Sequence, residues 1–416
     1  MKKIFVISVF CASMLVQASE VDDLKVQLKQ QQKLIEALTN RLDRLENKKV
    51  KIEKKSQDYS AYMQESKPSA SNSSASFSQK SYLPDIALIV NSSALGRNIS
   101  NTDYSSYSIP GFVSDDSEKE IPFNQDRGFN LNYAEVAISS AVDPYFDAFA
   151  IFHMRSDEFE IDEAYVSTRD LAYGLKVKAG KFKSAFGRYN EKHQHAWDFS
   201  EQALVYNAFF GPEGIGDAGI QVQWVAPTDT YFMLGAEAMQ GTNEQSFGYE
   251  SANNLYNAYA KVSLDISDDT SVLAGASILH GKNPQGNTDI YATDLTLQTQ
   301  LSSYSSLALQ SEYIYRDKEQ NFKNLKQDGM YAQLVYKYDQ NYAAGIRYDV
   351  LMKNNAGADN MDMYTGMLEY RPFEFSRLRL EYSLDKSKYF NGKQKDVQQL
   401  MLELNVAVGA HGAHSY

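Results

Sequence analysis

Apolar side chains recur at every second position over most of the chain, sixteen segments have the length of strands, and one apolar phase continues into the C-terminal segment. These observations predict an all-β transmembrane barrel of about 16 antiparallel strands, preceded by an N-terminal α-helical coiled coil. The alternation would give each strand one face for lipid and one for water. The 416 residues include 29 Tyr and 21 Phe but 9 Pro, which suits such strands.

The first element, residues 1–18, has the pattern of an export signal. Lys2 and Lys3 precede an apolar stretch from Ile4 to Val16, and Ala18 offers a small residue for cleavage. A helical membrane anchor would need about 18 uninterrupted apolar residues, and no later segment has them. The one cysteine, Cys11, lies within this segment, so we expect no disulfide in the mature chain.

The second and third elements are a helix and a linker. Over residues 19–52 the seam positions follow steps of three and four without an interrupting Pro or Gly. They are apolar except for Gln31 and Lys49. This heptad pattern predicts a coiled coil, with an amphipathic helix packed on the barrel as the alternative. Residues 53–83 are rich in Lys, Ser, Gln and Asn and predict a flexible linker.

The fourth element, residues 84–416, carries the barrel. Strands are expected over residues 85–96, 127–142, 146–156, 158–169, 173–181, 216–226, 230–240, 252–265, 270–280, 288–301, 304–316, 328–338, 341–352, 361–371, 376–385 and 396–408. Tight turns such as Asp143-Pro144 and Asp339-Gln340 are expected to alternate with longer polar loops, as short periplasmic turns and long external loops do in outer-membrane barrels.

The end of the chain carries a further signal of membrane insertion. Leu400, Leu402 and Leu404 keep one phase that ends on Tyr416. This resembles the C-terminal signal by which the barrel-assembly machinery recognises outer-membrane proteins. Tyrosines near the predicted strand ends, such as Tyr336 and Tyr338, fit an aromatic girdle at the membrane interface.

Several local sequences resemble a known family. They are residues 83–89, 179–182, 190–199, 224–229 and 409–416. Together they resemble a family of proteobacterial outer-membrane proteins of porin-like size, often labelled zinc-regulated or TonB-dependent-receptor-like and distantly similar to phosphate-selective and general porins. Ser415 departs from the pattern, because Pro is expected before the terminal aromatic residue. A TonB-dependent receptor would have 22 strands and a plug, so the count and the linker argue against a receptor.

The connection from about residue 185 to 214 is expected to narrow the pore. It is the longest inside the barrel after the first hairpin, and in the sixteen-strand porins that this chain resembles the third loop folds into the lumen. It contains Arg188, Glu191, His193 and His195. The alternative is a loop packed on the rim that only stiffens the wall.

Two charged rows lead into this connection. Lys176 and Lys178 share a strand face and are followed by Lys181 and Lys183. The row on the preceding strand consists of Glu158, Glu160 and Asp162. If the strands pair, both rows face the lumen, where separated charges would select solutes by sign and size. Alternatively, the rows neutralise each other as cross-strand pairs and stabilise the wall.

His193 and His195 suggest a zinc site, with Glu191 or Asp198 nearby. The alternative is ordinary hydrogen bonding, and no other cofactor is expected. No nucleophile, base and orienting residue recur in a recognisable arrangement, and no phosphate-binding glycine loop is present, so we expect no enzyme. The net charge of −12 argues against nucleic acid as a partner.

The leading hypothesis is an outer-membrane channel of a Gram-negative cell for passive or weakly selective diffusion of small hydrophilic solutes or ions. Lipid would surround the barrel, and the periplasmic coiled coil would hold a homo-oligomer, for which a trimer is attractive. One alternative is a metal uptake channel or receptor-like protein. Another is a structural tether whose coiled coil binds peptidoglycan or a partner. The transported solute and the ion preference stay open.

Overall fold

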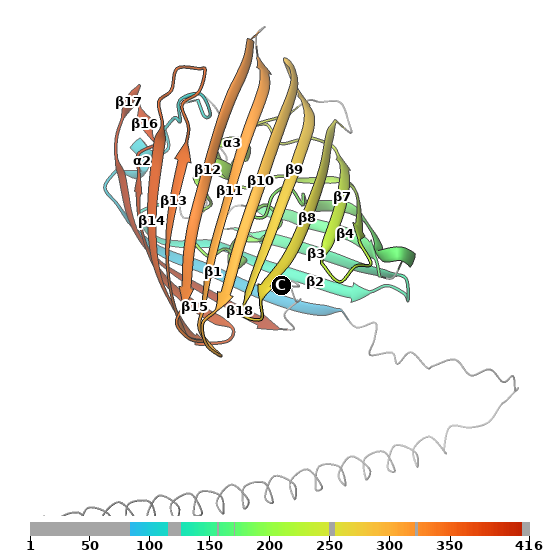
Figure 1. Cartoon of the computed structure of the whole chain (residues 1–416). Helices are drawn as coiled ribbons and strands as arrows, with labels where there is room; N and C mark the ends of the chain where they lie inside the picture. Colours follow the sequence, from blue (N-terminus) through green and yellow to red (C-terminus); the bar gives the residue numbers. More distant parts are fainter. Residues whose placement is uncertain are drawn as a thin grey trace, which may run out of the picture. The chain divides into compact units, whose positions relative to one another are not determined.

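The computed structural model describes residues 84–114, 126–155, 158–169, 171–248, 254–320 and 323–409. Within these residues, sixteen antiparallel strands form one closed barrel, as the sequence predicts (Figure 1). The chain divides into two units, Met1–Ser76 and Phe77–Tyr416, and the barrel belongs to the second. The predicted export signal, coiled coil and linker lie outside the described residues.

The strands follow one another around the wall in chain order. The first eight are β1 (Asp85–Arg97), β2 (Gly128–Ala141), β3 (Phe146–Met154), β4 (Phe159–Thr168), β5 (Leu175–Lys183), β6 (Gly216–Val225), β7 (Phe232–Met239) and β8 (Leu255–Ser267). The other eight are β9 (Thr270–Asn283), β10 (Gly286–Gln300), β11 (Ser306–Gln320), β12 (Lys323–Lys337), β13 (Tyr342–Leu351), β14 (Met361–Phe373), β15 (Ser376–Asp385) and β18 (Val397–Gly409).

Short elements complete the described fold. The two-residue strands β16 (Tyr389–Phe390) and β17 (Lys393–Gln394) form a separate hairpin between β15 and β18. The helices are α2 (Asn101–Tyr104), α3 (Leu204–Phe210) and two single 3-10 turns, Ala172–Gly174 and Gln194–Ala196. Among the described residues, no helix has both the length and the apolar character needed to cross a membrane.

The two-residue alternation sorts side chains between the outside and the inside of the wall. Along β18, Leu400, Leu402 and Leu404 are exposed on the outer face, while Met401 and Glu403 are buried on the inner face. Successive side chains of a strand point to opposite faces, so one apolar phase produces an apolar outer surface and a polar interior.

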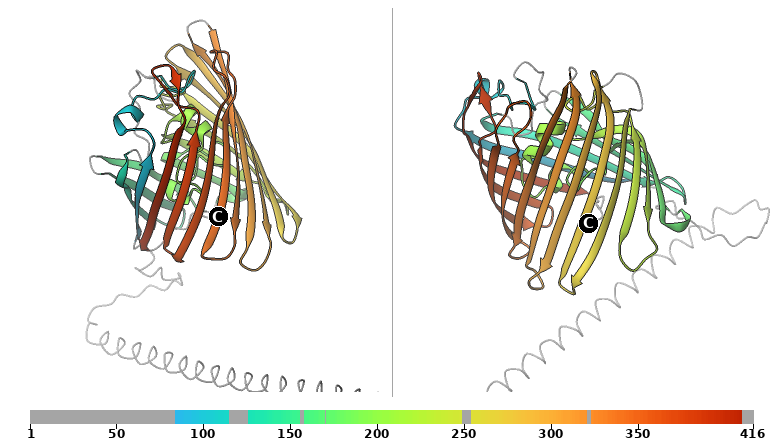
Figure 2. Two further views of the ribbon diagram at one scale, coloured as in Figure 1. Left: turned by 90° about the vertical axis from the view of Figure 1, so that its left-hand side faces the viewer. Right: turned by 45° about the horizontal axis from the view of Figure 1, so that its top comes forward.

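The strand boundaries differ most from the sequence prediction at the hairpins of the upper rim in Figure 2. β11 continues to Gln320 and β12 starts at Lys323, where ends at 316 and 328 were expected. β9 and β10 are joined by Pro284 and Gln285 alone, so the expected longer loop is a tight turn here. The Asn283 side chain accepts a hydrogen bond from the Gln285 backbone N–H at 2.8 Å, which stabilises this turn.

The two rims of the barrel otherwise differ in connection length (Figure 2). Two-residue hairpins at 268–269 and 374–375 lie on the lower rim. The long connections 98–127, 184–215 and 240–254 join strand ends on the opposite rim. Both ends of the described barrel meet at the rim of short turns, where Ala87 is paired with Gly409.

Candidate functional site

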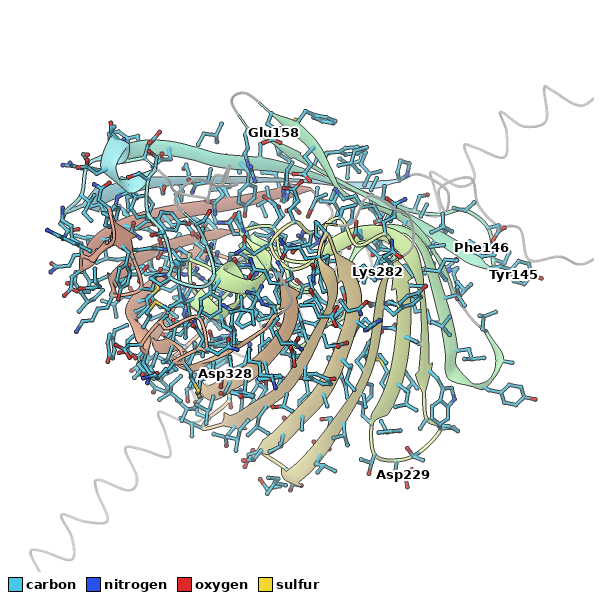
Figure 3. The ribbon with its side chains drawn as sticks, turned by 90° about the horizontal axis from the view of Figure 1, so that it is seen from above. Tyr145, Phe146, Glu158, Asp229, Lys282 and Asp328 are labelled. Atoms are coloured by element: carbon cyan, nitrogen blue, oxygen red, sulfur yellow. The ribbon has the colours of Figure 1, made fainter. Side chains whose placement is uncertain are left out.

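The connection between β5 and β6, residues 184–215, lies inside the ring of strands (Figure 3). We call it the lumen loop. Its helix α3 is almost wholly buried, with the apolar side chains Leu204, Val205, Tyr206, Ala208, Phe209 and Phe210. They share one hydrophobic cluster with inward-facing residues of β10–β13, namely Ile290, Ile314, Tyr331 and Leu351. Such burial fixes the loop within the barrel instead of leaving it on the rim.

Arginines of β13 and β15 bind the backbone of the lumen loop. Arg347 extends from β13, and Arg377 and Arg379 extend from β15. They donate hydrogen bonds to the carbonyl oxygens of His195, Trp197, Glu201 and Gln202 over distances of 2.8 to 3.2 Å. We call this side the arginine wall. Because a guanidinium stays charged at any physiological pH, these contacts persist across that range.

Carboxylates elsewhere on the wall accept the backbone N–H groups of the same loop. Glu237 on β7, Glu312 on β11 and Asp349 on β13 are all buried. Their partners are the N–H groups of Ala185 at 2.9 Å, Arg188 at 3.0 Å and Leu204 at 2.9 Å. The loop backbone is therefore held from several sides, which satisfies polar groups that a buried loop would otherwise leave unpaired.

A β-bulge on β4 turns two successive carboxylates into the barrel. Ile151 of β3 opposes Glu163 and Phe152 opposes Ile161, so Asp162 is the extra residue. A bulge breaks the two-residue alternation locally. Asp162 and Glu163 are consequently both buried on the inner face, at 4% and 6% exposure.

These carboxylates meet histidines from the wall and from the lumen loop. The group comprises Glu135 on β2, His153 on β3, Asp162 and Glu163 on β4, and His193 and His195 of the lumen loop. We call it the imidazole–carboxylate cluster. It is the contact between the lumen loop and the side of the barrel formed by β2, β3 and β4.

Short distances connect the cluster. His193 Nδ1 lies 3.0 Å from Asp162 Oδ2, and His193 Nε2 lies 2.8 Å from Glu163 Oε2. Glu135 Oε2 lies 3.0 Å from His153 Nε2. The same oxygen lies 3.2 Å from His195 Nδ1. At its edge, Lys183 Nζ lies 3.1 Å from Asp162 Oδ1.

The electrostatics of the loop side follow from this geometry. Burial lowers the pKa of the His193 imidazole, but hydrogen bonds with Asp162 and Glu163 outweigh burial and raise the pKa to about 10. At neutral pH this imidazole is therefore a cation between carboxylates. Elsewhere in the lumen loop, burial raises the pKa of Glu201, although Gln399 donates a hydrogen bond to its carboxylate.

The two charged rows of the sequence analysis come to lie on paired strands, since β4 and β5 are neighbours. Lys181 Nζ is 3.2 Å from Glu160 Oε1, and Lys183 is paired with Asp162. These two pairs correspond to the neutralised arrangement rather than to separated charges.

The remaining members of these rows take different positions. Lys178 lies over the Tyr165 ring, 4.6 Å from its centroid. Lys176 is exposed on β5. Glu158 precedes β4 and lies 3.4 Å from Arg155 Nη1, with 57% of its side chain exposed. Neither Lys176 nor Glu158 is brought to the imidazole–carboxylate cluster.

Among the predicted constriction residues, Arg188 and Glu191 lie in the lumen loop. The Glu191 carboxylate is 2.7 Å from Lys261 Nζ of β8, so a further part of the loop contacts the wall. Tyr416, together with His411 and His414, lies outside the described residues.

Neither the arginine wall nor the partnership of Glu135 and His153 with the loop histidines was expected from the sequence. The arginines could have been recognised from the sequence. Arg347 and Asp349 are two positions apart on the inward face of their strand, and so are Arg377 and Arg379. No local signal in the sequence joins Glu135 and His153 to the loop histidines, which lie 40 residues or more away in sequence. Their contact depends on the path of the loop across the lumen.

Comparison with known proteins adds one relative by sequence. A protein of Aquifex aeolicus (strain VF5), described only as an uncharacterized protein, is 39% identical over 383 residues. The match covers 82% of this chain and 81% of that protein. No family model matches the chain.

Solved structures resemble the barrel at low sequence identity. The outer membrane channel DcaP of Acinetobacter baumannii has a TM-score of 0.54 at 12% identity, covering 80% of this chain and 99% of that one. The anion-selective porin from Comamonas acidovorans has a TM-score of 0.54 at 11% identity, covering 78% and 99%. OmpT of Vibrio cholerae in its trimer form has a TM-score of 0.51 at 14% identity, also covering 78% and 99%. The shared feature is the fold.

Proposed function

The chain belongs to the same family as the Aquifex aeolicus protein, and from its barrel we propose that it is an outer-membrane channel for small hydrophilic solutes or ions. The lumen loop is the constriction of this channel. The observation that carries the proposal is a buried loop held across the interior of a closed barrel whose inner face is polar. Passage then depends on the space between this loop and the wall.

A polar hollow at the rim of short turns supports a wet interior. Its volume is about 660 Å³, and its lining includes Asp265, Ser271 and Gln298. These residues share the strand phase of Lys261, Ser277 and Asp294, which are buried on the inner face. Solutes would enter or leave through this polar hollow, and the lumen loop would limit their size.

Single-channel conductance of the full chain in planar lipid bilayers tests the proposal. The matched variant replaces residues 190–210 with a short Gly-Ser linker, which removes α3 and most of the constriction. We expect defined conductance steps for the natural sequence and steps several-fold larger for the variant. Heat-modifiable migration on SDS gels shows whether each barrel has folded.

Two results would contradict the proposal. A folded protein that gives no conductance steps would favour the structural tether, in which the barrel serves as an anchor. Equal conductance with and without residues 190–210 would mean that the lumen loop is not the constriction. Liposome swelling with sugars of increasing size then gives the size limit directly.

Localisation and assembly belong to the same proposal. The barrel would reside in the lipid of the outer membrane, inserted by the barrel-assembly machinery through the segment that ends at Tyr416. The solved OmpT trimer provides a precedent for a homo-oligomer of this fold. Cell fractionation tests the first point, since recovery with cytosol would contradict it. Native mass spectrometry with and without residues 19–52 tests whether the predicted coiled coil holds the oligomer.

A further inference from the structure

We propose that Glu135, His153 and His193 bind a divalent transition-metal ion of the zinc type, and that this ion ties the lumen loop to the wall. The inference rests on the proposed channel only for its second clause, since metal binding does not depend on conduction. The sequence suggested His193 and His195 as ligands, whereas two of the three ligands proposed here, Glu135 and His153, come from the wall.

The donor atoms are of the right kind and close enough together. One atom each from Glu135, His153 and His193 lies within 4.8 Å of the other two. Imidazole nitrogens and carboxylate oxygens are the ligands that zinc accepts in mixed sites, at about 2.0 to 2.2 Å. Catalytic zinc sites commonly use three protein ligands and leave one position for water or substrate. Small movements of these side chains would bring the three atoms to metal-binding distance.

The surroundings orient the histidines as metal ligands are usually oriented. His193 Nε2 is held by Glu163 at 2.8 Å, which leaves Nδ1 directed at the group formed by Glu135 and Asp162. A metal-bound histidine almost always gives its other ring N–H to a carboxylate or carbonyl. His195 Nδ1 lies 3.2 Å from Glu135 Oε2 and fixes that carboxylate.

The two proposed ligands that come from the wall, Glu135 and His153, each have a buried atom without a hydrogen-bond partner. These atoms are Glu135 Oε1 and His153 Nδ1, on side chains with 1% and 4% exposure. Buried polar atoms are nearly always paired, so an unpaired one calls for an occupant. A cavity of about 20 Å³ borders His153 and Lys183, which is enough for one water molecule. Such a water would complete the coordination of the ion.

The charge balance of the imidazole–carboxylate cluster favours a divalent cation. Glu135, Asp162 and Glu163 contribute three negative charges, and Lys183 contributes one positive charge. With neutral imidazoles, one divalent cation balances the remainder. Metal ligands must be deprotonated, so binding of the ion releases any proton that a ligand imidazole carries.

Isothermal titration calorimetry of the folded full chain in detergent, first stripped with a chelator, tests the site. The probe is ZnCl₂ and the variants are Glu135→Gln, His153→Gln and His193→Gln. The control is His280→Gln, because His280 also contacts a carboxylate, at 2.7 Å from Asp289, but lies exposed on β9. We expect a site saturating at one Zn²⁺ per chain that His280→Gln retains and each of the three variants weakens at least tenfold.

Cobalt provides a second readout that does not depend on heat of binding. Co²⁺ bound by two imidazoles and a carboxylate at four-coordinate geometry gives intense visible absorption bands. We expect these bands for the natural sequence and for His280→Gln, and their loss in His153→Gln with an unchanged far-UV circular dichroism spectrum. Weak bands typical of a six-coordinate hydrated ion in all proteins would contradict the site.

The outcomes separate this inference from the proposed function. If no zinc binds at micromolar concentration, or if all three variants bind as the natural sequence does, the metal site is wrong whatever the conductance. If zinc binds and the protein gives no conductance, the channel is wrong and the site stands. If both hold, zinc is expected to reduce fluctuations of the open-channel current in the natural sequence and not in His193→Gln; unchanged fluctuations would contradict the tie between loop and wall.

Discussion

Two of the attachments that hold the lumen loop to the barrel differ in their chemistry. At the arginine wall, Arg347, Arg377 and Arg379 bind main-chain carbonyl oxygens. At the second attachment, the side chains of His193 and His195 meet carboxylates of β2 and β4. The first depends on groups whose charge is constant, and the second on groups that exchange protons or accept a metal.

The two attachments have different consequences for the lumen loop, because one fixes its path and the other can change while that path is kept. Bonds from a guanidinium to the backbone do not depend on which side chains the loop carries, so they fix its path. Contacts through imidazoles depend on the occupant of the cluster, so they can change while the path is kept. We therefore expect variants of the arginine wall to affect folding most and variants of the imidazole–carboxylate cluster to affect ligand response most.

The largest effect is expected from Arg379→Ala. Arg379 Nη2 lies 2.8 Å from Glu369 Oε2, and both side chains are almost fully buried, at 1% and 3% exposure. Removing one partner of a buried ion pair leaves an uncompensated charge and costs about 3 to 5 kcal/mol. We expect the lower end of this range because Arg377 also approaches Glu369. Denaturant unfolding in lipid vesicles measures the loss.

Arg371→Ala is the matched control, because Arg371 contacts the same Glu369 at 2.6 Å but is 43% exposed. Exposed pairs contribute about 0 to 1 kcal/mol. If Arg371→Ala lowered the unfolding free energy as much as Arg379→Ala does, the contact of Arg379 with the lumen loop would not make it more important for stability than the exposed Arg371.

An intermediate effect is expected from Gly187→Ala, in the part of the lumen loop that precedes both attachments. Gly187 has φ +63, and a Cβ atom there would lie 2.3 Å from Glu312 Oε2 and 2.4 Å from the Tyr206 hydroxyl. Strain of this kind costs about 1 to 3 kcal/mol. The unfolding free energy should fall by this amount. Gly366→Ala, where no atom lies within 4 Å of the added carbon, should leave it almost unchanged, and a similar fall there would refute the steric explanation.

The smallest effect is expected from Lys181→Ala beside the imidazole–carboxylate cluster. Its pair with Glu160 is about one-third exposed on both sides, at 34% and 32%. Such a pair contributes about 0 to 1 kcal/mol. Lys183→Ala should cost more, since the pair of Lys183 with Asp162 is 10% and 6% exposed. Thermal unfolding of both variants compares the two losses of stability. A larger loss for Lys181→Ala than for Lys183→Ala would contradict the expected order.

The wall of the barrel was largely predictable from the sequence. Alternation is a local property, so β15 occupies residues 376–385 as expected, and β6 differs from expectation by one residue at its end. The turn at Pro284 was missed because polar residues such as Lys282 and Asn287 read as a loop, while the paired strands continue through them.

The interior was less predictable. The position of the lumen loop followed from its length and the porin resemblance, but its partners depend on residues far away in sequence. Asp162 and Glu163 illustrate the difficulty. Strict alternation assigns adjacent residues to opposite faces, and the bulge that turns both inward leaves no mark in their identities. His153, alone among apolar neighbours in β3, gave no indication of a ligand.

The closure of β1 against β18 has a consequence for folding. Arg97 of β1 and Gln399 of β18 form a hydrogen bond across 302 positions of sequence. The other wall pairs join consecutive strands or, for β15 and β18, strands separated by one small hairpin. The seam therefore joins the strands that are farthest apart in sequence, and it cannot form until the final segment has been exported. The pairing of β1 with β18 is therefore expected to be the slowest step of assembly, and a nearly complete open sheet should accumulate before it.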